Sequence, residues 1–424
     1  MGKFVTAAEA VQCVKSGDRV YVQAAAAAPS ILTAALTERA SELRDVEICH
    51  LHTEGPAPYA NPELSESFHV NSFFIGKNVR HTLSAGNGSY TPVFLSELPH
   101  LFRKRVVVPD VVFIHVSPPD AHGYCSLGVS IEATKAAIEV AKIVVAQVNP
   151  RMPRTFGDGI LHEREIDFMV EADVAIHGHG VAPISPEEEK IGSFIAELIE
   201  DGSTLQMGIG NIPNAALAKL GNHKNLGLHT EMFSDGVIPL IQSGVVDCSQ
   251  KAVARGRALA TFLIGSQQLY DFVDDNPLVE LRESSFVNDT AVIRRNPKMV
   301  AINSAIEVDV TGQVCADSIG PNMYSGVGGQ MDFIRGASLS QGGKAIIALP
   351  SITKRGESRI VPFLKKGAGV VTTRSHVQYI ITEYGVADLY GKTLSQRLEA
   401  MVAIAHPDHR ENIRKEYRDY CSTC

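Results

Sequence analysis

The stretch TLQMGIGNIPNAALAKLGNHKNLGLHTEMFSDG, residues 204–236, decides the fold and the chemistry that we expect of this chain. It begins as an apolar strand, breaks at the glycine loop GIG, enters a helix near Pro213 and returns as a second strand that ends at Glu231. Glycines in such a loop leave backbone N–H groups open to a phosphate or a thioester. A carboxylate at the end of the next strand can act as a nucleophile or a base. The stretch therefore predicts a strand–helix–strand unit that carries a reaction centre.

The same order of elements occurs in the first half of the chain. An amphipathic helix, a Gly-Asp turn, a strand, a helix that follows a proline and a second strand occupy residues 6–52. The tetrapeptide LHTE closes the second strand in both halves and contains Glu54 in one copy and Glu231 in the other. A shared order of elements with a shared tetrapeptide predicts a tandem duplication. We expect two related open α/β domains, residues 1–183 and 184–424, joined at a proline-containing linker.

The apolar segments predict mainly parallel sheets. Several of them are continuous rather than alternating, as is typical of parallel strands that are buried on both faces. Ligands of open α/β sheets bind beyond the carboxyl ends of the strands, and both Glu54 and Glu231 fall there. The apolar runs that we predict to be strands are residues 106–108, 111–116, 143–148, 345–349, 369–372 and 379–382.

Composition excludes several classes of function. The chain has 424 residues, 45% of them hydrophobic and 20% charged, and its formal net charge is −8. A protein with this charge lacks the basic surface that nucleic acid requires, so we expect no nucleic-acid partner. No apolar run is long enough to cross a bilayer, and residues 1–18 contain no apolar signal core. With seven cysteines, an odd number that fits reduced thiols, we expect a cytoplasmic protein that does not bind membranes.

Patterns that resemble metal sites are incomplete. Cys421 and Cys424 form a CxxC motif at the extreme C-terminus, where a frayed tail is the favoured interpretation. The histidine pairs at residues 177–179 and 406–409 lack further ligands nearby, which favours ordinary loop histidines. We therefore expect no metal in this protein.

The two copies differ in their glycine content. After its first strand, the first copy has five alanines at residues 24–28, where the second copy has its GIG loop. A second glycine-rich run, SGVGGQMDF at residues 325–333, has a counterpart at residues 124–130 with a single glycine. Each feature alone also fits a tight turn or a solvated strand end. Together, two loops rich in N–H donors and one glutamate favour the second copy as the catalytic one and the first as a wall of the acid-binding site.

Five motifs make the chain resemble family I coenzyme A transferases of the acetyl-CoA hydrolase/transferase group. Within this family the chain is most similar to 4-hydroxybutyrate CoA-transferases and butyryl-CoA:acetate CoA-transferases, over nearly its whole length. The family fold of two open α/β domains agrees with the duplication. The motifs are QVNPRMPRTFGD (147–158), QMGIGNIPN (206–214), HTEMFSDG (229–236), AINSAIEVD (301–309) and SGVGGQMDFIRG (325–336).

The resemblance implies roles for single residues. Glu231 would form a glutamyl-CoA thioester with the assistance of Asn288. Gly329 would help to bind CoA and would offer its N–H group to the oxyanion. Lys354 and Arg355 are candidates for binding the CoA phosphates because of their charge. The other residues that we expect to contact CoA are Gln206, Met207, Gly208, Ile209, Gly210, Ile306 and Gly328.

The reaction implied by the resemblance transfers CoA from a short-chain acyl-CoA, such as 4-hydroxybutyryl-CoA or butyryl-CoA, to a carboxylic acid such as acetate. Ping-pong kinetics are expected, with CoA as a substrate and no permanently bound cofactor. An acyl-CoA hydrolase, in which water cleaves the same thioester, is the main alternative. A sugar-phosphate isomerase and a non-catalytic binding protein are two others, and neither needs a covalent glutamate.

The repeat also provides candidates for the acyl and acid side of the site. In the first copy, the side chains expected to face the acyl group or the carboxylate are His52, Glu54, Tyr59 and Tyr90. The family further implies a homodimer or a higher homo-oligomer.

Overall fold

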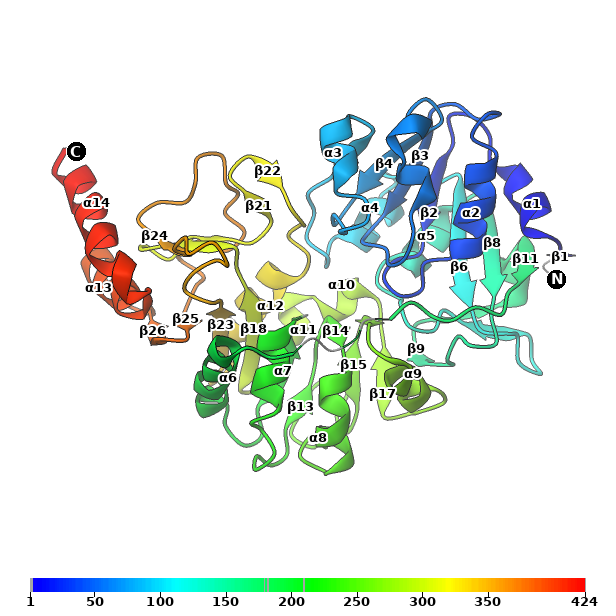
Figure 1. Ribbon diagram of the computed structural model, residues 1–424. Helices are drawn as coiled ribbons and strands as arrows, with labels where there is room; N and C mark the ends of the chain where they lie inside the picture. The colour runs from blue at the N-terminus through cyan, green and yellow to red at the C-terminus, as the bar shows by residue number, and fades with distance from the viewer. Residues whose placement is uncertain (1–2, 179, 181–182, 209, 424) are drawn as a thin grey trace. The chain divides into compact units, whose positions relative to one another are not determined.

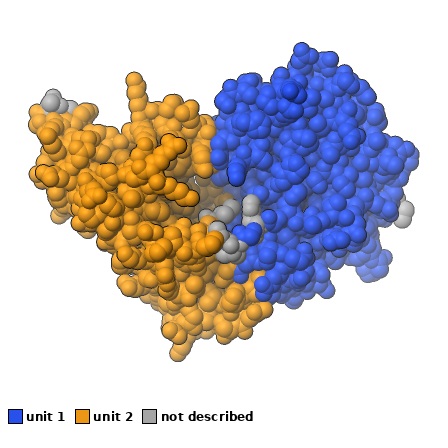
Figure 2. Space-filling model, viewed as in Figure 1, with its two compact units in different colours: residues 1–180, 232–235, 259–287 blue, residues 181–231, 236–258, 288–424 orange. Residues whose placement is uncertain are grey.

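The computed structural model describes residues 3–178, 180, 183–208 and 210–423. The chain forms two compact units, shown in different colours in Figure 2. Unit 1 comprises Met1–Gly180, Met232–Asp235 and Leu259–Val287, and unit 2 comprises the remaining segments. The first boundary lies close to the one predicted at residues 183 and 184. Two segments of the second half, however, belong to unit 1.

Unit 1 is built on an eight-stranded sheet in which every neighbouring pair is parallel (Figure 1). Its order is β1-β11-β8-β6-β2-β3-β4-β5. The central strand β6 is buried at every position, as expected of a parallel strand covered on both faces. The strands are β1 (Lys3–Phe4), β2 (Arg19–Val22), β3 (Val46–His50), β4 (Phe68–Ser72), β5 (Gly88–Tyr90), β6 (Val111–Val116), β8 (Ile143–Val148) and β11 (Phe168–Glu171), and the helices before Gly180 are α1 (Ala7–Ala10), α2 (Ser30–Glu38), α3 (His81–Ala85), α4 (Leu98–Arg103) and α5 (Thr134–Val140).

Unit 2 contains a six-stranded sheet of order β13-β12-β18-β23-β25-β26, in which only the β25–β26 pair is antiparallel. Helices α6 and α7 pack side by side (Figure 1), and α12 packs on β18 and β23. The strands are β12 (Thr204–Met207), β13 (Gly227–Leu228), β18 (Met299–Ser304), β23 (Lys344–Ala348), β25 (Tyr379–Thr382) and β26 (Gly385–Asp388), and the helices are α6 (Pro186–Leu198), α7 (Asn211–Leu217), α8 (Ile238–Gln242), α11 (Thr290–Ile293), α12 (Gln330–Leu339), α13 (Leu394–Ile404) and α14 (Arg410–Thr423).

The two sheets share one strand order, which supports the duplication. Five adjacent strands of unit 1 lie in the order β3-β2-β6-β8-β11, and five of unit 2 lie in the order β13-β12-β18-β23-β25. Numbered along the chain, both sets of five have the order 2-1-3-4-5, and β1, β4 and β5 extend the unit 1 sheet as β26 extends the unit 2 sheet. This doubly wound order places a ligand crevice where the direction of winding reverses, between the first and third strands. In unit 2 that point lies between β12 and β18. The predicted α/β fold with mainly parallel sheets is confirmed.

Three local predictions differ from the structure. Residues 106–108 are not a strand, because the N–H groups of Val106 and Val107 donate to the carbonyl of Leu101 in the turn that ends α4. Residues 369–372 form no strand beyond an isolated bridge of Thr372 with Val314. The C-terminus is not frayed up to residue 423, since Cys421 lies in helix α14.

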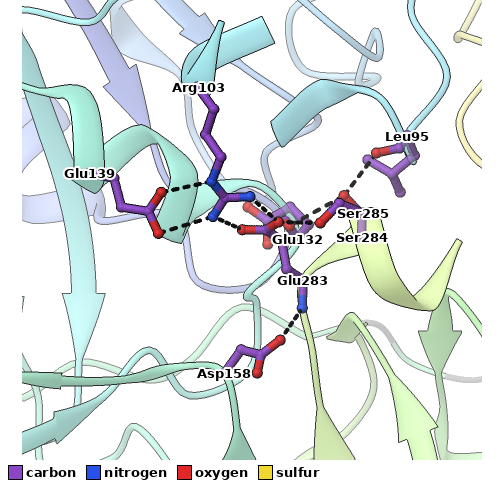
Figure 3. A network of polar contacts seen from close by, with 8 residues as sticks. All are labelled: Leu95, Arg103, Glu132, Glu139, Asp158, Glu283, Ser284 and Ser285. Carbon is purple, nitrogen blue, oxygen red and sulfur yellow. Dashed lines mark hydrogen bonds and ion pairs between the residues drawn. The ribbon is translucent and has the colours of Figure 1, made fainter. Parts of the chain in front are cut away.

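Segment Leu259–Val287 is attached to unit 1 by short strands and by an ionic cluster that includes the buried carboxylate of Glu283. Strand β17 (Val279–Leu281) pairs with β9 (Phe156–Gly157), and β16 (Phe262–Leu263) pairs with β14 (Met232–Phe233). Figure 3 shows Arg103 between two carboxylates: Nη1 and Nη2 lie 2.5 and 2.7 Å from the oxygens of Glu283, and Nε lies 2.7 Å from Glu139. Glu283 is only 5% exposed, so Arg103 neutralises a buried charge.

Replacing Arg103 by leucine should lower the free energy of unfolding by about 2–4 kcal/mol, because it leaves the buried Glu283 carboxylate without a cation. Chemical denaturation would measure the loss. Arg151→Leu is the matched control: Arg151 pairs with Asp173 at an exposed position, so its loss should change the free energy of unfolding much less than the loss of Arg103. Equal losses in the two variants would contradict this role of Arg103.

Candidate active site

Glu231 stands at the carboxyl end of β13, the outermost strand of the unit 2 sheet on that side. Its Oε2 atom accepts a hydrogen bond of 2.9 Å from Asn288 Nδ2, and the backbone N–H of Gly329 also donates to the carboxylate. Asn288 is fully buried and Glu231 is half-buried. The structure thus brings together the three residues that were predicted to be catalytic.

Burial raises the pKa of Glu231 to about 7, although the hydrogen bonds from Asn288 and Gly329 favour the ionised form and act in the opposite direction. The carboxylate is therefore poorly hydrated and is held by two neutral donors. A carboxylate of this kind is a better nucleophile than one paired with a cation, because less stabilisation is lost when it attacks.

Gly329 can approach Glu231 only because it has no side chain. A Cβ atom at this position would lie 1.9 Å from Glu231 Oε2 and 2.1 Å from Asn288 Nδ2. The preceding Gly328 has a φ angle of 56°, which glycine adopts without strain, and this turn leads into α12 directly after Gly329. The turn and helix start therefore place a backbone donor against the carboxylate.

The residues before Glu231 fix the loop in place. Thr230 Oγ1 accepts a hydrogen bond from the N–H of Met207 and donates one to its carbonyl, both at 3.2 Å. Asn296 Oδ1 accepts from two backbone N–H groups, at residues 252 and 253, so its amide nitrogen is the group that faces His229 Nδ1 at 2.9 Å. This orientation places the proton of neutral His229 on Nε2.

A cavity of about 700 Å³ opens at the same edge of the unit 2 sheet. It is lined by residues at or after the carboxyl ends of four parallel strands: Gly210 after β12, Ser304 on β18, Leu349 after β23 and Glu383 after β25. The cavity therefore includes the β12–β18 reversal point, the position at which open α/β sheets bind their ligands.

The residues predicted to contact CoA have different surroundings. Gly210 and Lys354 line the cavity. Gln206 is 3% exposed and exchanges two amide hydrogen bonds, of 3.0 and 3.4 Å, with Asn303 on β18. The N–H of Gly208 donates to the carbonyl of Ile302.

Three further predicted contacts complete this set. Met207 is buried, and Ile306 is half-buried with its N–H donated to Cys315. Ile209 lies outside the described residues. Within the described part of the chain, no group of three or more His, Cys, Asp or Glu side chains could hold a metal ion.

Comparison with known proteins identifies the family. The model of the acetyl-CoA hydrolase/transferase N-terminal domain matches residues 1–178, and that of the C-terminal domain matches residues 265–417. The chain belongs to the acetyl-CoA hydrolase/transferase family. The predicted resemblance is thereby confirmed, and the chain is an enzyme of this family.

Individual relatives match over most of their length. The chain is 50% identical to a succinyl-CoA:acetate/propanoyl-CoA:succinate CoA transferase from Fasciola hepatica, over 95% of this chain and 85% of that protein. It is 46% identical to 4-hydroxybutyrate coenzyme A transferase from Clostridium kluyveri, over 98% and 97%. A crystal structure of 4-hydroxybutyrate CoA-transferase from Porphyromonas gingivalis is similar with a TM-score of 0.85 and 40% identity, over 99% and 98% of the two chains.

The four residues predicted to face the acyl group lie in unit 1 and differ in accessibility. His52 packs against the rings of Phe74 and Phe262, and its Nε2 lies 4.0 Å from Glu54 Oε1. Tyr90 is half-buried at the end of the outermost strand β5. Tyr59 is 2% exposed within the hydrophobic core of unit 1, so it has no surface to offer to a substrate.

Sequence reasoning missed two parts of this site. Asn296, which orients His229, lies outside the sequence motifs. From the sequence alone, it could not be distinguished from an asparagine in an ordinary turn. Arg359 lines the cavity at the start of β24 (Ile360–Val361) but lies outside the motifs and the basic pair Lys354-Arg355. The basic composition of residues 354–359 is the signal that could have included it.

The raised pKa of Glu231 predicts a pH dependence. As a nucleophile, Glu231 would attack in its ionised form, so kcat/KM for acyl-CoA should rise with pH through an apparent pKa of about 7 and level off above it. Asn288→Ala removes a donor that favours ionisation, so the midpoint should move to higher pH. Initial rates from about pH 5.5 to 8.5 would test this. A profile that is flat below pH 7, or unmoved in the variant, would contradict it.

Gly329→Ala should lower kcat by a factor on the order of 10²–10³, since the added methyl group displaces the donor or the carboxylate. Gly221→Ala is the control, because a Cβ there meets no atom within 4 Å. Steady-state rates of both variants, with circular dichroism to verify folding, measure the effect. Equal activities of the two would show that the close approach at Gly329 is not required.

Proposed function

We propose that this protein transfers CoA between a short-chain acyl-CoA and a carboxylic acid such as acetate, through a glutamyl-CoA thioester on Glu231. The observation that supports this most directly is the Glu231 carboxylate held by Asn288 and the Gly329 N–H group, in a chain of the acetyl-CoA hydrolase/transferase family. Asn288 supports the nucleophile, and Gly329 is the proposed oxyanion donor.

The first half-reaction begins with attack of the Glu231 carboxylate on the thioester carbonyl. The C–S bond breaks, CoA leaves as a thiolate, and an acyl-glutamyl anhydride forms. The thiolate then attacks the glutamyl carbonyl of the anhydride, which releases the acyl group as its carboxylate and leaves the glutamyl-CoA thioester. One thioester replaces another, so no other energy source is needed.

The second half-reaction runs the same steps in reverse. The incoming carboxylate attacks the glutamyl thioester, and the released thiolate then takes the new acyl group from the anhydride. Every tetrahedral intermediate carries an oxyanion. In the intermediates formed by addition to the glutamyl carbonyl, the oxyanion is an oxygen of Glu231, and the Gly329 N–H group, which donates to this carboxyl group, can stabilise it by about 3 kcal/mol.

The CoA molecule is proposed to lie along the carboxyl edge of the unit 2 sheet. Gln206, Met207, Gly208, Ile209, Gly210, Ile306 and Gly328 are its proposed neighbours, with Lys354 near the phosphates. Gly210 has a φ angle of 127° and no atom within 4 Å of its Cβ position, which leaves room for a ligand against the backbone.

We propose 4-hydroxybutyryl-CoA or butyryl-CoA as the acyl donor, and His52, Glu54 and Tyr90 as acyl-side residues. We leave Tyr59 out of this proposal because its side chain is 2% exposed. The half-buried Glu54 carboxylate can accept a hydrogen bond from a substrate hydroxyl and would repel a second carboxylate. These properties favour a hydroxyacyl or uncharged acyl chain over a dicarboxylate.

A hydrolase that uses the same covalent intermediate is the second candidate, supported by the name of the family, which covers both activities. The two differ in whether water or an acid cleaves the glutamyl thioester. Release of free CoA thiol at the same rate with and without millimolar acetate would favour the hydrolase. Acetate-dependent formation of acetyl-CoA would favour the transferase.

Incubation with acyl-CoA followed by borohydride should convert Glu231, through its thioester, to the alcohol. Peptide mass spectrometry would locate this change. Glu231→Gln should abolish the modification and lower kcat by at least about 10³-fold, because a neutral amide cannot form the anhydride. Glu189→Gln, at an exposed salt bridge with Lys219, is the control and should retain both. Modification of Glu54 instead would refute the assignment of the second copy.

A further inference from the structure

Asp235 lies four residues after Glu231, and its carboxylate fixes the chain that follows Glu231. The N–H group of Ser266 donates to both carboxylate oxygens, at 2.9 Å to Oδ2 and 3.2 Å to Oδ1, and the Ser266 hydroxyl also donates to Oδ1. Asp235 is half-buried. Hydrogen bonds to an ionised acceptor are stronger than those between neutral groups, so these bonds hold Asp235 firmly against Ser266.

The segment between Glu231 and Asp235 contains β14, a strand of only two residues that pairs in parallel with β16. So short a pair has few ladder hydrogen bonds to define its register. The bonds between Asp235 and Ser266 lie just beyond the ends of both strands, and they therefore keep β14 from sliding along β16. Since Glu231 directly precedes β14, the register of this pair also sets the position of the Glu231 backbone.

The segment that holds Asp235 is itself fixed. Gly265 is buried, and a Cβ atom there would lie 2.2 Å from Asp235 Oδ2, so the carboxylate can approach this backbone only because residue 265 is glycine. Tyr270, which is 2% exposed, donates its hydroxyl hydrogen to the carbonyl of His177, and its oxygen lies 3.5 Å from the backbone nitrogen of Gly265. Helix α9 (Gln267–Val273) begins in the same turn. Asp235 is therefore bonded to a packed part of unit 1.

We propose that Asp235 is a positioning residue for Glu231, on which it acts through the backbone. The Glu231–Met232 peptide bond joins unit 2 to unit 1, so Glu231 requires an anchor on each side of this bond. Thr230 is the anchor before it, through its hydrogen bonds with Met207, and Asp235 is the anchor after it. The inference rests on the proposed function and adds a residue that keeps the Glu231 carboxylate in place for attack on a thioester.

The decisive experiment separates turnover from CoA binding. Asp235→Ala should lower kcat about 10–100-fold, because a displacement of about 1 Å in a reacting group costs a factor of this order. The Kd for CoA should stay within about twofold of the wild-type value, since Asp235 is not among the proposed CoA contacts. Asp235→Asn keeps an oxygen that can accept from the Ser266 N–H group, and it should retain kcat within about fivefold. Initial rates of acyl transfer give kcat, and titration calorimetry with CoA gives Kd.

Gly265→Ala tests the same contact without removing a hydrogen-bonding group, because the added Cβ atom meets Asp235 Oδ2. It should lower kcat about tenfold in the wild-type protein and by less than about threefold in Asp235→Ala, where the carboxylate is absent. Asp271→Ala is the matched control: Asp271 is exposed on α9 and accepts a hydrogen bond only from Gln267 of the same helix among the described residues. It should change kcat and the Kd for CoA by less than about twofold.

Two results would overturn the inference. An unchanged kcat in Asp235→Ala would show that Glu231 needs no anchor there, and an equal loss of kcat and CoA affinity would make Asp235 a purely structural residue. The proposed function is tested separately by trapping the Glu231 thioester in the wild-type protein. If no thioester forms but Asp235→Ala still loses kcat at unchanged CoA affinity, the positioning role stands without the covalent mechanism.

Discussion

The close approach of the Gly329 backbone to the Glu231 carboxylate is the constraint on which the rest of unit 2 depends. A donor can reach this carboxylate only if α12 begins beside the end of β13, and α12 is seated by its contacts with β18 and β23. A second glycine allows that seating, because a Cβ at Gly336 would lie 2.4 Å from Ile293 of α11. Phe333 of the same helix meets the ring of His229 edge-on. The helix and the loop that carries Glu231 are therefore fixed against each other by packing, before any substrate binds.

The electrostatics around Glu231 follow from the choice of neutral donors. An arginine or lysine in contact with the carboxylate would lower the pKa of Glu231. It would also stabilise the ionised carboxylate and so make it a weaker nucleophile. An amide and a backbone N–H group instead orient the carboxylate while burial keeps its pKa near neutrality. The ionised form is thus available at physiological pH but is weakly stabilised, which is the state that a covalent carboxylate nucleophile requires.

Local sequence patterns predicted the strands and turns whose formation depends on residues that are close together in the sequence. The LHTE repeat and the continuous apolar runs contained enough information for two parallel α/β sheets, because strand burial and turn composition are encoded within each segment. Glu231 and the glycine loops could be identified in the same way, whereas Asn288 came from family resemblance. The return of Leu259–Val287 to unit 1 could not be predicted, since it depends on Arg103 and Glu283, which are 180 positions apart. Val106 and Val107 were misassigned because a helix-ending turn used their N–H groups.

Arg359 and Asn296 show why the remainder of the site escaped prediction. Neither an asparagine nor an arginine is distinctive in a sequence. The role of each depends on whether the fold supplies hydrogen-bond partners for its side chain. Asn296 has both of its amide groups occupied, so it acts as a fixed strut for His229. Arg359 has its Nε atom shielded from solvent with no hydrogen-bond acceptor among the described residues.

The parallel sheet gives these two kinds of residue a common geometry. It aligns the carboxyl ends of β13, β12, β18, β23 and β25 along one edge, with the Glu231 carboxylate after the first and the cavity around the others. On the proposed function, binding energy released at the cavity can favour the strained acyl-transfer steps at Glu231 without any contact with the reacting atoms. The basic residues Lys190, Lys354 and Arg359 line the cavity, whereas Glu231 is held by neutral donors, so charged ligand groups can be bound at this edge without lowering the pKa of the Glu231 carboxylate.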